Sequence, residues 1–152
     1  MRAPTAAGAE CRRAARSRAR ALQAALGVGA AALVLAGCGA PATRVSGARA
    51  AGEQFVRALA ANDREAACRL LAPETREALE QEERTACGPA LGAEDLPEAG
   101  TVRATEVYGR QAMLRLEGDT LFLSLFDSGW KVVAAGCTPR AEQPYQCELK
   151  GG

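Results

Sequence analysis

The sequence predicts an α+β fold, in which N-terminal helices pack on one face of a curved, four- to five-stranded antiparallel sheet. Apolar residues between positions 47 and 87 recur at the spacing of amphipathic helices. Beyond residue 100 the pattern changes to strict alternation, which is typical of strands with one buried face. Short turn sequences separate the alternating runs, so consecutive strands can pair as a meander.

Three helices are expected before the sheet. The first covers residues 47–61, with Phe55 and Leu59 on its core face. Asp63 can cap a second helix over residues 64–71, and Pro73 occupies a first-turn position that opens a third. Residues 88–100 contain two prolines and three glycines before the alternation begins. We therefore expect them to form a linker.

The predicted strands follow in sequence order. Turns at Gly109-Arg110, Gly118-Asp119 and Asp127-Ser128-Gly129 separate alternating runs over 101–107, 112–117, 121–126 and 130–135. In the first run the alternation places Val102, Ala104 and Glu106 on one face. A short segment over residues 145–149 is expected to lie beside the fourth strand.

The first 37 residues have the pattern of an export signal. Six arginines and one glutamate occupy residues 1–23, and residues 24–36 carry no charge. Thirteen apolar residues reach only about 20 Å as a helix, which is short of the roughly 30 Å hydrocarbon core. The segment is therefore predicted to be a signal peptide. Arg12-Arg13 leaves twin-arginine export open, although Ala14-Ala15 favours general secretion.

This segment ends in Leu35-Ala36-Gly37-Cys38, which resembles the bacterial lipobox. The resemblance implies that the Cys38 thiol receives a diacylglycerol and that cleavage precedes Cys38. Acyl chains such as palmitate would then hold the protein on the outer face of the cell membrane. Residues 38–46 would be a tether and residues 47–150 the domain. The alternative is a buried cysteine in an Ala-rich helix.

Processing at Cys38 would change the charge of the protein. The formal net charge of the full chain is +1, and the 13 basic and 17 acidic residues after the leader give about −4. Nucleic-acid binding depends on cationic neutralisation of phosphates, so an acidic body disfavours it. The Ala-, Arg- and Gly-rich composition is typical of a high-GC actinobacterium.

Four cysteines remain after Cys11 is discarded and Cys38 is lipidated. In an oxidising compartment they predict two disulfides, and we prefer the local pairs Cys68–Cys87 and Cys137–Cys147. The first pair requires the third helix to break near residues 80–83, since an unbroken helix would separate the two thiols by about 20 Å. A zinc site is the alternative, but gaps of eighteen and nine residues are too wide for its usual paired ligands.

The runs FVRALAAND (55–63), CRLLAPETR (68–76) and GWKV (129–132) resemble segments of small actinobacterial lipoproteins. These belong to the nuclear-transport-factor-2-like superfamily, whose fold is a cystatin-like cone. The resemblance covers most of residues 47–150 and implies a fold and a location. Its motifs are structural, so it implies no activity.

The chain contains no histidine. Nucleophile systems that use an imidazole base, and metal sites that use imidazole ligands, are therefore excluded. If the domain were a cone-fold enzyme, its candidate groups would be Tyr108, Asp119, Asp127 and Tyr145. The aspartates fit turn positions better, and we expect Tyr108 to be a half-buried strand residue. Candidate lining residues for a cavity between sheet and helices, with core packing as their alternative role, are Phe55, Leu59, Phe122, Phe126 and Trp130.

Three functions are compatible with the sequence. We favour a non-enzymatic lipoprotein that binds an envelope protein or a small ligand, without cofactor, metal or assigned catalytic residue. The alternatives are a cone-fold enzyme acting on a small hydrophobic substrate and a structural accessory subunit of a membrane complex. An exposed apolar patch on the sheet would favour the accessory subunit.

Overall fold

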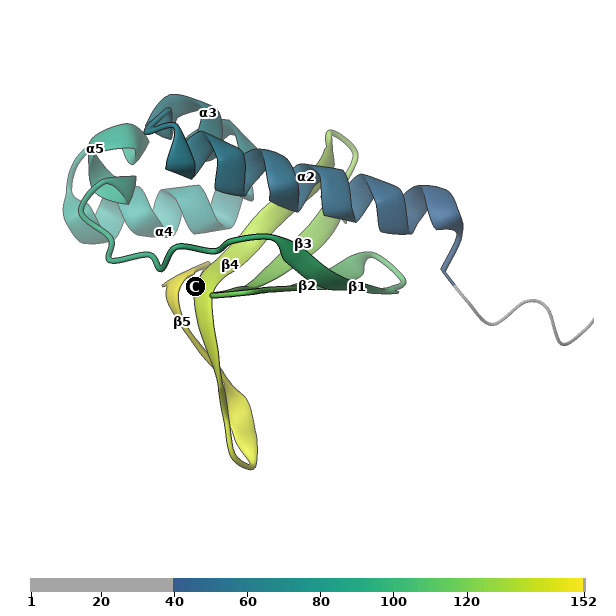
Figure 1. Cartoon of the computed structure of the whole chain (residues 1–152). Coiled ribbons are helices and arrows are strands. Elements are labelled where there is room, and N and C mark those ends of the chain that lie inside the picture. The colour runs from purple at the N-terminus through teal and green to yellow at the C-terminus, as the bar shows by residue number, and fades with distance from the viewer. Residues whose placement is uncertain (1–39, 152) are drawn as a thin grey trace, which may run out of the picture. The chain divides into compact units, whose positions relative to one another are not determined.

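The computed structural model describes residues 40–151 (Figure 1). Over this range, helices α2 (Ala42–Ala60), α3 (Arg64–Leu70), α4 (Pro73–Glu83) and α5 (Cys87–Leu91) precede the sheet. Five strands pair in sequence order as an antiparallel meander: β1 (Val102–Tyr108), β2 (Gln111–Leu116), β3 (Thr120–Phe126), β4 (Gly129–Arg140) and β5 (Gln143–Lys150). The predicted α+β layout is confirmed. The predicted signal peptide and the predicted lipidation site Cys38 lie outside the described residues.

Helix α2 begins at Ala42, five residues before the predicted start, so half of the predicted tether is helical. Gly47 was expected to open the helix, but it lies inside it. A Cβ at Gly47 would stand 3.2 Å from Cδ1 of Trp130, which packs beneath the helix. The glycine therefore makes room for an indole ring and does not mark a helix boundary.

The predicted N-cap and helix break are both present. The backbone N–H of Ala66 donates to the Asp63 carboxylate at 3.0 Å, which caps α3. Helix α4 ends at Glu83, and Arg84 adopts a left-handed conformation with φ 53°. The chain then turns back, and Cys87 forms a disulfide with Cys68 at a Cα separation of 6.1 Å. Residues 87–91, mostly expected to be linker, form α5, which begins at the disulfide-bonded Cys87.

The sheet differs from the prediction in strand β1. Val102 pairs with Leu116 and Ala104 with Arg115, so a bulge at residue 103 shifts the register. Thr105 consequently pairs with Leu114, which is completely buried beneath the helices. Val102, Thr105 and Val107 share the covered face, and the prediction that Val102 shares a face with Ala104 and Glu106 is wrong.

Helix α2 crosses the sheet and covers its core face, as Figure 1 shows. A Cβ at Gly52 would come within 2.3 Å of the Leu114 side chain, so this glycine permits the close approach of helix and sheet. The largest fully buried side chains are Phe55, Leu114, Leu121, Leu123, Val132 and Thr75. None of the helices within residues 40–151 combines the length and the apolar character needed to cross a bilayer.

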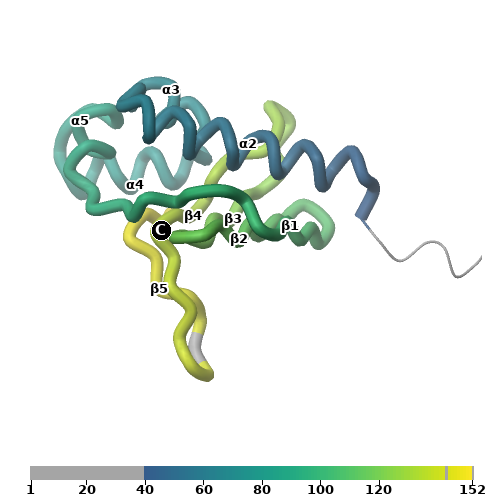
Figure 2. The backbone as a smooth tube through the Cα atoms, in the orientation of Figure 1, coloured from purple at the N-terminus to yellow at the C-terminus, as the bar shows by residue number. Residues whose placement is uncertain are grey.

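Strands β4 and β5 extend past the rest of the sheet as a projecting hairpin (Figure 2). Cys137 and Cys147 are directly opposite each other in this pair of strands, with Cα atoms 4.0 Å apart, and form the second disulfide. Both predicted disulfide pairs are thus present. An isolated two-stranded ribbon is only marginally stable in water, so this crosslink stabilises the hairpin at its base.

Candidate ligand-binding cleft

A cleft of about 710 Å³ opens between α2, the α2–α3 turn and the segment that joins α5 to β1. Its apolar lining includes Val56, Leu59, Leu91 and Leu96. Its polar lining residues are Arg57, Asn62, Arg64, Glu94 and Glu98. The volume lies within the range usual for small-molecule sites.

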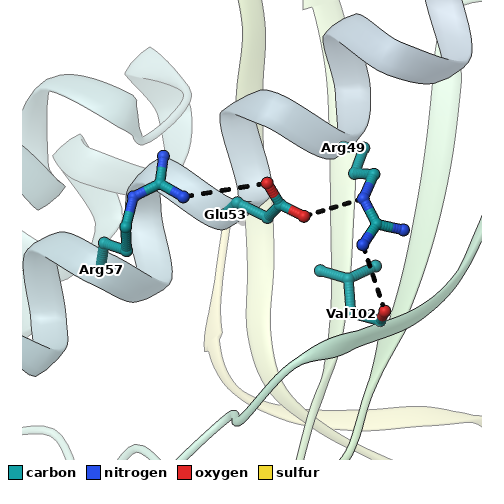
Figure 3. Close-up of polar contacts among 4 residues, drawn as sticks. All are labelled: Arg49, Glu53, Arg57 and Val102. Atoms are coloured by element: carbon teal, nitrogen blue, oxygen red, sulfur yellow. Dashed lines mark hydrogen bonds and ion pairs between the residues drawn. The ribbon is translucent and has the colours of Figure 1, made fainter.

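Arg57 belongs to a ladder of charges along α2 (Figure 3). Arg49 Nε donates to Glu53 at 2.8 Å, and Arg57 Nη1 lies 3.8 Å from the other oxygen of the same carboxylate. Arg49 Nη2 also donates to the carbonyl of Val102 at 3.4 Å, which ties α2 to the start of β1. Exposed pairs of this kind contribute less than about 1 kcal/mol each. Arg57 therefore presents an exposed guanidinium at the cleft that is only weakly paired with Glu53.

Arg64, the first residue of α3, provides the second cation of the cleft. A Cβ at Gly92 would stand 2.6 Å from Arg64 Nε, so the guanidinium lies directly against the backbone at the end of α5. No carboxylate within residues 40–151 forms an ion pair with Arg64. Its charge is therefore open to a ligand in the cleft.

The segment that follows α5 adds two acidic residues, Glu94 and Glu98, to the lining, and they form what we call the acidic wall. The pKa of Glu94 is raised by partial burial and, to a smaller extent, by repulsion from Glu82, Glu83 and Glu148. The wall itself is fixed by the β2–β3 turn. Gly118 N–H donates to the carbonyl of Ala99 at 3.0 Å.

On its other side, Glu94 borders a smaller hollow of about 340 Å³ beside α4 and β5. The lining residues include Leu79, Glu82, Glu148 and Lys150. Among the described residues, no three Cys, Asp or Glu side chains are grouped so that they could hold a metal ion. The acidic groups here act on Glu94 through repulsion.

The five candidate lining residues from the sequence do not share one cavity. Leu59 lines the cleft, whereas Phe55 is completely buried in the core and Trp130 is buried beneath α2. Phe122 lies between two fully buried leucines of β3 and so points to the opposite sheet face, where it packs edge-on against Tyr145 at 5.1 Å. Phe126 is half-buried near the end of β3, on the same face as Phe122.

The candidate acid–base groups are likewise dispersed. Asp119 accepts hydrogen bonds from the backbone N–H groups of Thr120, Gly136 and Cys137. Asp127 is fully exposed in the β3–β4 turn, where it faces Arg110 at 3.7 Å. Tyr108 is 72% exposed, so the expectation that it is half-buried is wrong, because it lies on the uncovered face beside a turn. Tyr145 contacts Phe122.

Sequence reasoning missed Arg57, Arg64, Glu94 and Glu98 as site residues. Arg57 belongs to the predicted first helix, whose named core residues are Phe55 and Leu59, and Glu94 and Glu98 belong to the predicted linker, so no local pattern distinguishes the three as site residues. Gly92 was a usable signal, because a glycine after a short apolar segment can mark a close approach of backbone to a side chain. No protein-family model, characterised protein or solved structure matches the chain.

Proposed function

We propose that the protein is an exported lipoprotein, held by lipid on Cys38 at the outer face of the cell membrane, whose domain binds a small ligand without transforming it. The observation on which the binding role rests is the cleft beside α2, whose charged groups leave room for a ligand. The lipobox at residues 35–38 supports the location.

The cysteine pairing supports export. Each of Cys68, Cys87, Cys137 and Cys147 is paired, at Cα separations of 6.1 and 4.0 Å. Disulfides form and persist mainly in oxidising compartments. A domain crosslinked by two disulfides is suited to the oxidising space outside the plasma membrane.

The placement of the titratable groups supports binding over catalysis. A general base must reach the proton it removes, usually from within a pocket. Asp119 is engaged with three backbone N–H groups, and none of the candidate acid–base groups Tyr108, Asp119, Asp127 and Tyr145 lines the cleft. We further infer that the fold is a nuclear-transport-factor-2-like cone, which the order of helices and meander strands supports.

Anchoring is tested by labelling cells that express the chain with an alkyne analogue of palmitate. Wild type should incorporate the label and partition into the detergent phase of Triton X-114. Cys38→Ser should do neither and should retain its leader. Cys11→Ser is the matched control, because it removes a leader cysteine outside the lipobox and should behave as wild type. Normal processing and labelling of Cys38→Ser would overturn the anchoring proposal.

Binding is tested by native mass spectrometry of the protein released from membranes. Wild type should carry a small molecule that is absent from Leu59→Trp, in which the indole fills the cleft. Ala61→Trp, an exposed position beside the same helix end, is the control. Identical spectra for wild type and Leu59→Trp would contradict a ligand in this cleft.

A further inference from the structure

We propose that the cleft recognises a zwitterionic small molecule with an apolar body, such as a short peptide with free amino and carboxyl ends. This inference rests on the proposed binding function and names the ligand class for the same site. It follows from the two arginines and two glutamates of the lining and from the apolar residues that accompany them.

Arg57 and Arg64, which we call the cationic wall, would bind the carboxylate of the ligand. Arg64 has no ion-pair partner among the described residues, and its position against Gly92 fixes it at the cleft. Arg57 has only a 3.8 Å contact with Glu53, whose nearer partner is Arg49 at 2.8 Å. Guanidinium groups bind carboxylates through paired, charge-assisted hydrogen bonds, and both arginines retain donors for this purpose.

The acidic wall would bind the ammonium group. Neither Glu94 nor Glu98 forms an ion pair with any residue in the 40–151 range. No ion pair therefore joins the arginines of the cleft to its glutamates within residues 40–151. Repulsion from Glu82, Glu83 and Glu148 makes a cation beside Glu94 favourable, since it would compensate the crowded carboxylates.

The apolar residues of the lining determine the size and the apolar character of the ligand's body. Val56, Leu59, Leu91 and Leu96 offer an apolar surface within a volume of about 710 Å³. With two cations and two acids in this lining, the cleft complements a ligand of zero net charge that carries one charge of each sign. A ligand with only one charge would satisfy one wall and leave the other without a partner.

The experiment uses the mature lipidated protein in phosphatidylcholine liposomes at pH 7, with thermal unfolding followed by the fluorescence of Trp130, the single tryptophan of the chain. The probes are leucyl-leucine, its N-acetyl derivative and its C-terminal amide. Saturating leucyl-leucine should raise the unfolding midpoint by about 5 °C or more. Each capped derivative should bind at least tenfold more weakly.

Two variants assign the walls. In Arg64→Gln the dipeptide should lose its advantage over the amide, and in Glu94→Gln it should lose its advantage over the N-acetyl derivative. Arg69→Gln and Glu77→Gln, exposed positions on α3 and α4 outside the cleft, should keep the wild-type order.

Equal binding of all three probes, or wild-type ranking in both wall variants, would overturn the zwitterion proposal. If none of the three probes bound, the zwitterion proposal would also be overturned. If a small molecule still copurified with wild type and not with Leu59→Trp, the proposed binding function would stand. If no probe bound and no small molecule copurified with wild type, the proposed binding function would be overturned as well.

Discussion

The carboxylate of Asp119 accepts a hydrogen bond from the backbone N–H of Cys137 at 2.9 Å. Its other oxygen accepts from the N–H of Gly136 at 3.1 Å. The side chain therefore links the β2–β3 turn to β4 at the base of the projecting hairpin, beside the Cys137–Cys147 disulfide. It supplies acceptors to two buried backbone groups that lie beyond the pairing of β3 with β4. Asp119 thus has a structural role, since it joins the β2–β3 turn to β4.

Replacing Asp119 with alanine should lower the free energy of unfolding by about 1–3 kcal/mol, because it leaves buried N–H donors without acceptors. Urea unfolding of the mature protein, followed by Trp130 fluorescence, measures the change. Asp127→Ala is the control, since its carboxylate is fully exposed, and it should stay within about 0.5 kcal/mol of wild type. Equal effects of the two substitutions would contradict the structural role of Asp119.

Glu94 predicts a pH dependence of stability. Its pKa in the folded protein is raised above the ordinary 4.5, first by burial and then by neighbouring acids. The folded state consequently binds this proton more tightly than the unfolded chain does, so ionised Glu94 costs stability at neutral pH. This cost disappears as the pH falls through the raised pKa towards 4.5.

Glu94→Gln should therefore be more stable than wild type at pH 7, by less than about 1 kcal/mol because the group is partly exposed. The advantage should vanish near pH 4, where wild-type Glu94 is protonated. Urea midpoints at the two pH values provide the measurement, and Glu77→Gln on the exposed face of α4 serves as control. A Glu94→Gln variant less stable than wild type at pH 7 would show that the sign is wrong.

The two disulfides should stabilise different parts of the domain. Replacing either pair with alanines should cost about 3 kcal/mol on the loop-entropy model. Loss of Cys137–Cys147 should also expose the hairpin locally, since residues 138–146 have no core of their own. Hydrogen exchange measured by mass spectrometry should show faster exchange confined to this hairpin. Unchanged exchange there would mean that the crosslink is not needed to hold the hairpin.

Gly118 should couple stability to the cleft. A Cβ at this position would stand 2.2 Å from the carbonyl oxygen of Glu98, and a backbone oxygen cannot move aside cheaply. Gly118→Ala should cost about 1–3 kcal/mol and weaken leucyl-leucine binding, because it displaces the acidic wall. Gly109→Asn is the control, since Gly109 has open space and a φ of 60° that asparagine tolerates. If Gly118→Ala bound leucyl-leucine as wild type does, the claim that the β2–β3 turn positions the acidic wall would be contradicted.

Local chemistry was sufficient to predict most elements of the fold. Asp63 predicted a helix cap, Pro73 predicted a helix start, and alternating leucines predicted β3, because each signal acts within a few residues. The helix break after Glu83 could be predicted because the Cys68–Cys87 pair requires it.

Features that depend on tertiary contact could not be predicted. Gly47 was misassigned because its reason is the ring of Trp130, which is distant in sequence. The bulge at residue 103 leaves no periodic signal. The cleft forms only when the segment after α5 returns past α2, and this brings Glu98 to the same site as Arg57. Charged residues on a helix face and in a linker do not reveal that they share a cleft.

The central claim is that the domain is displayed outside the cell on a lipidated Cys38. Intact-mass spectrometry of the protein extracted from the membranes of a bacterium expressing the full chain tests it most directly. The predicted species begins at Cys38, carries the added mass of a diacylglycerol on that residue, and lacks the four hydrogen atoms that are removed when four thiols form two disulfides. A chain that still contains residues 1–37 and bears no lipid would contradict the claim.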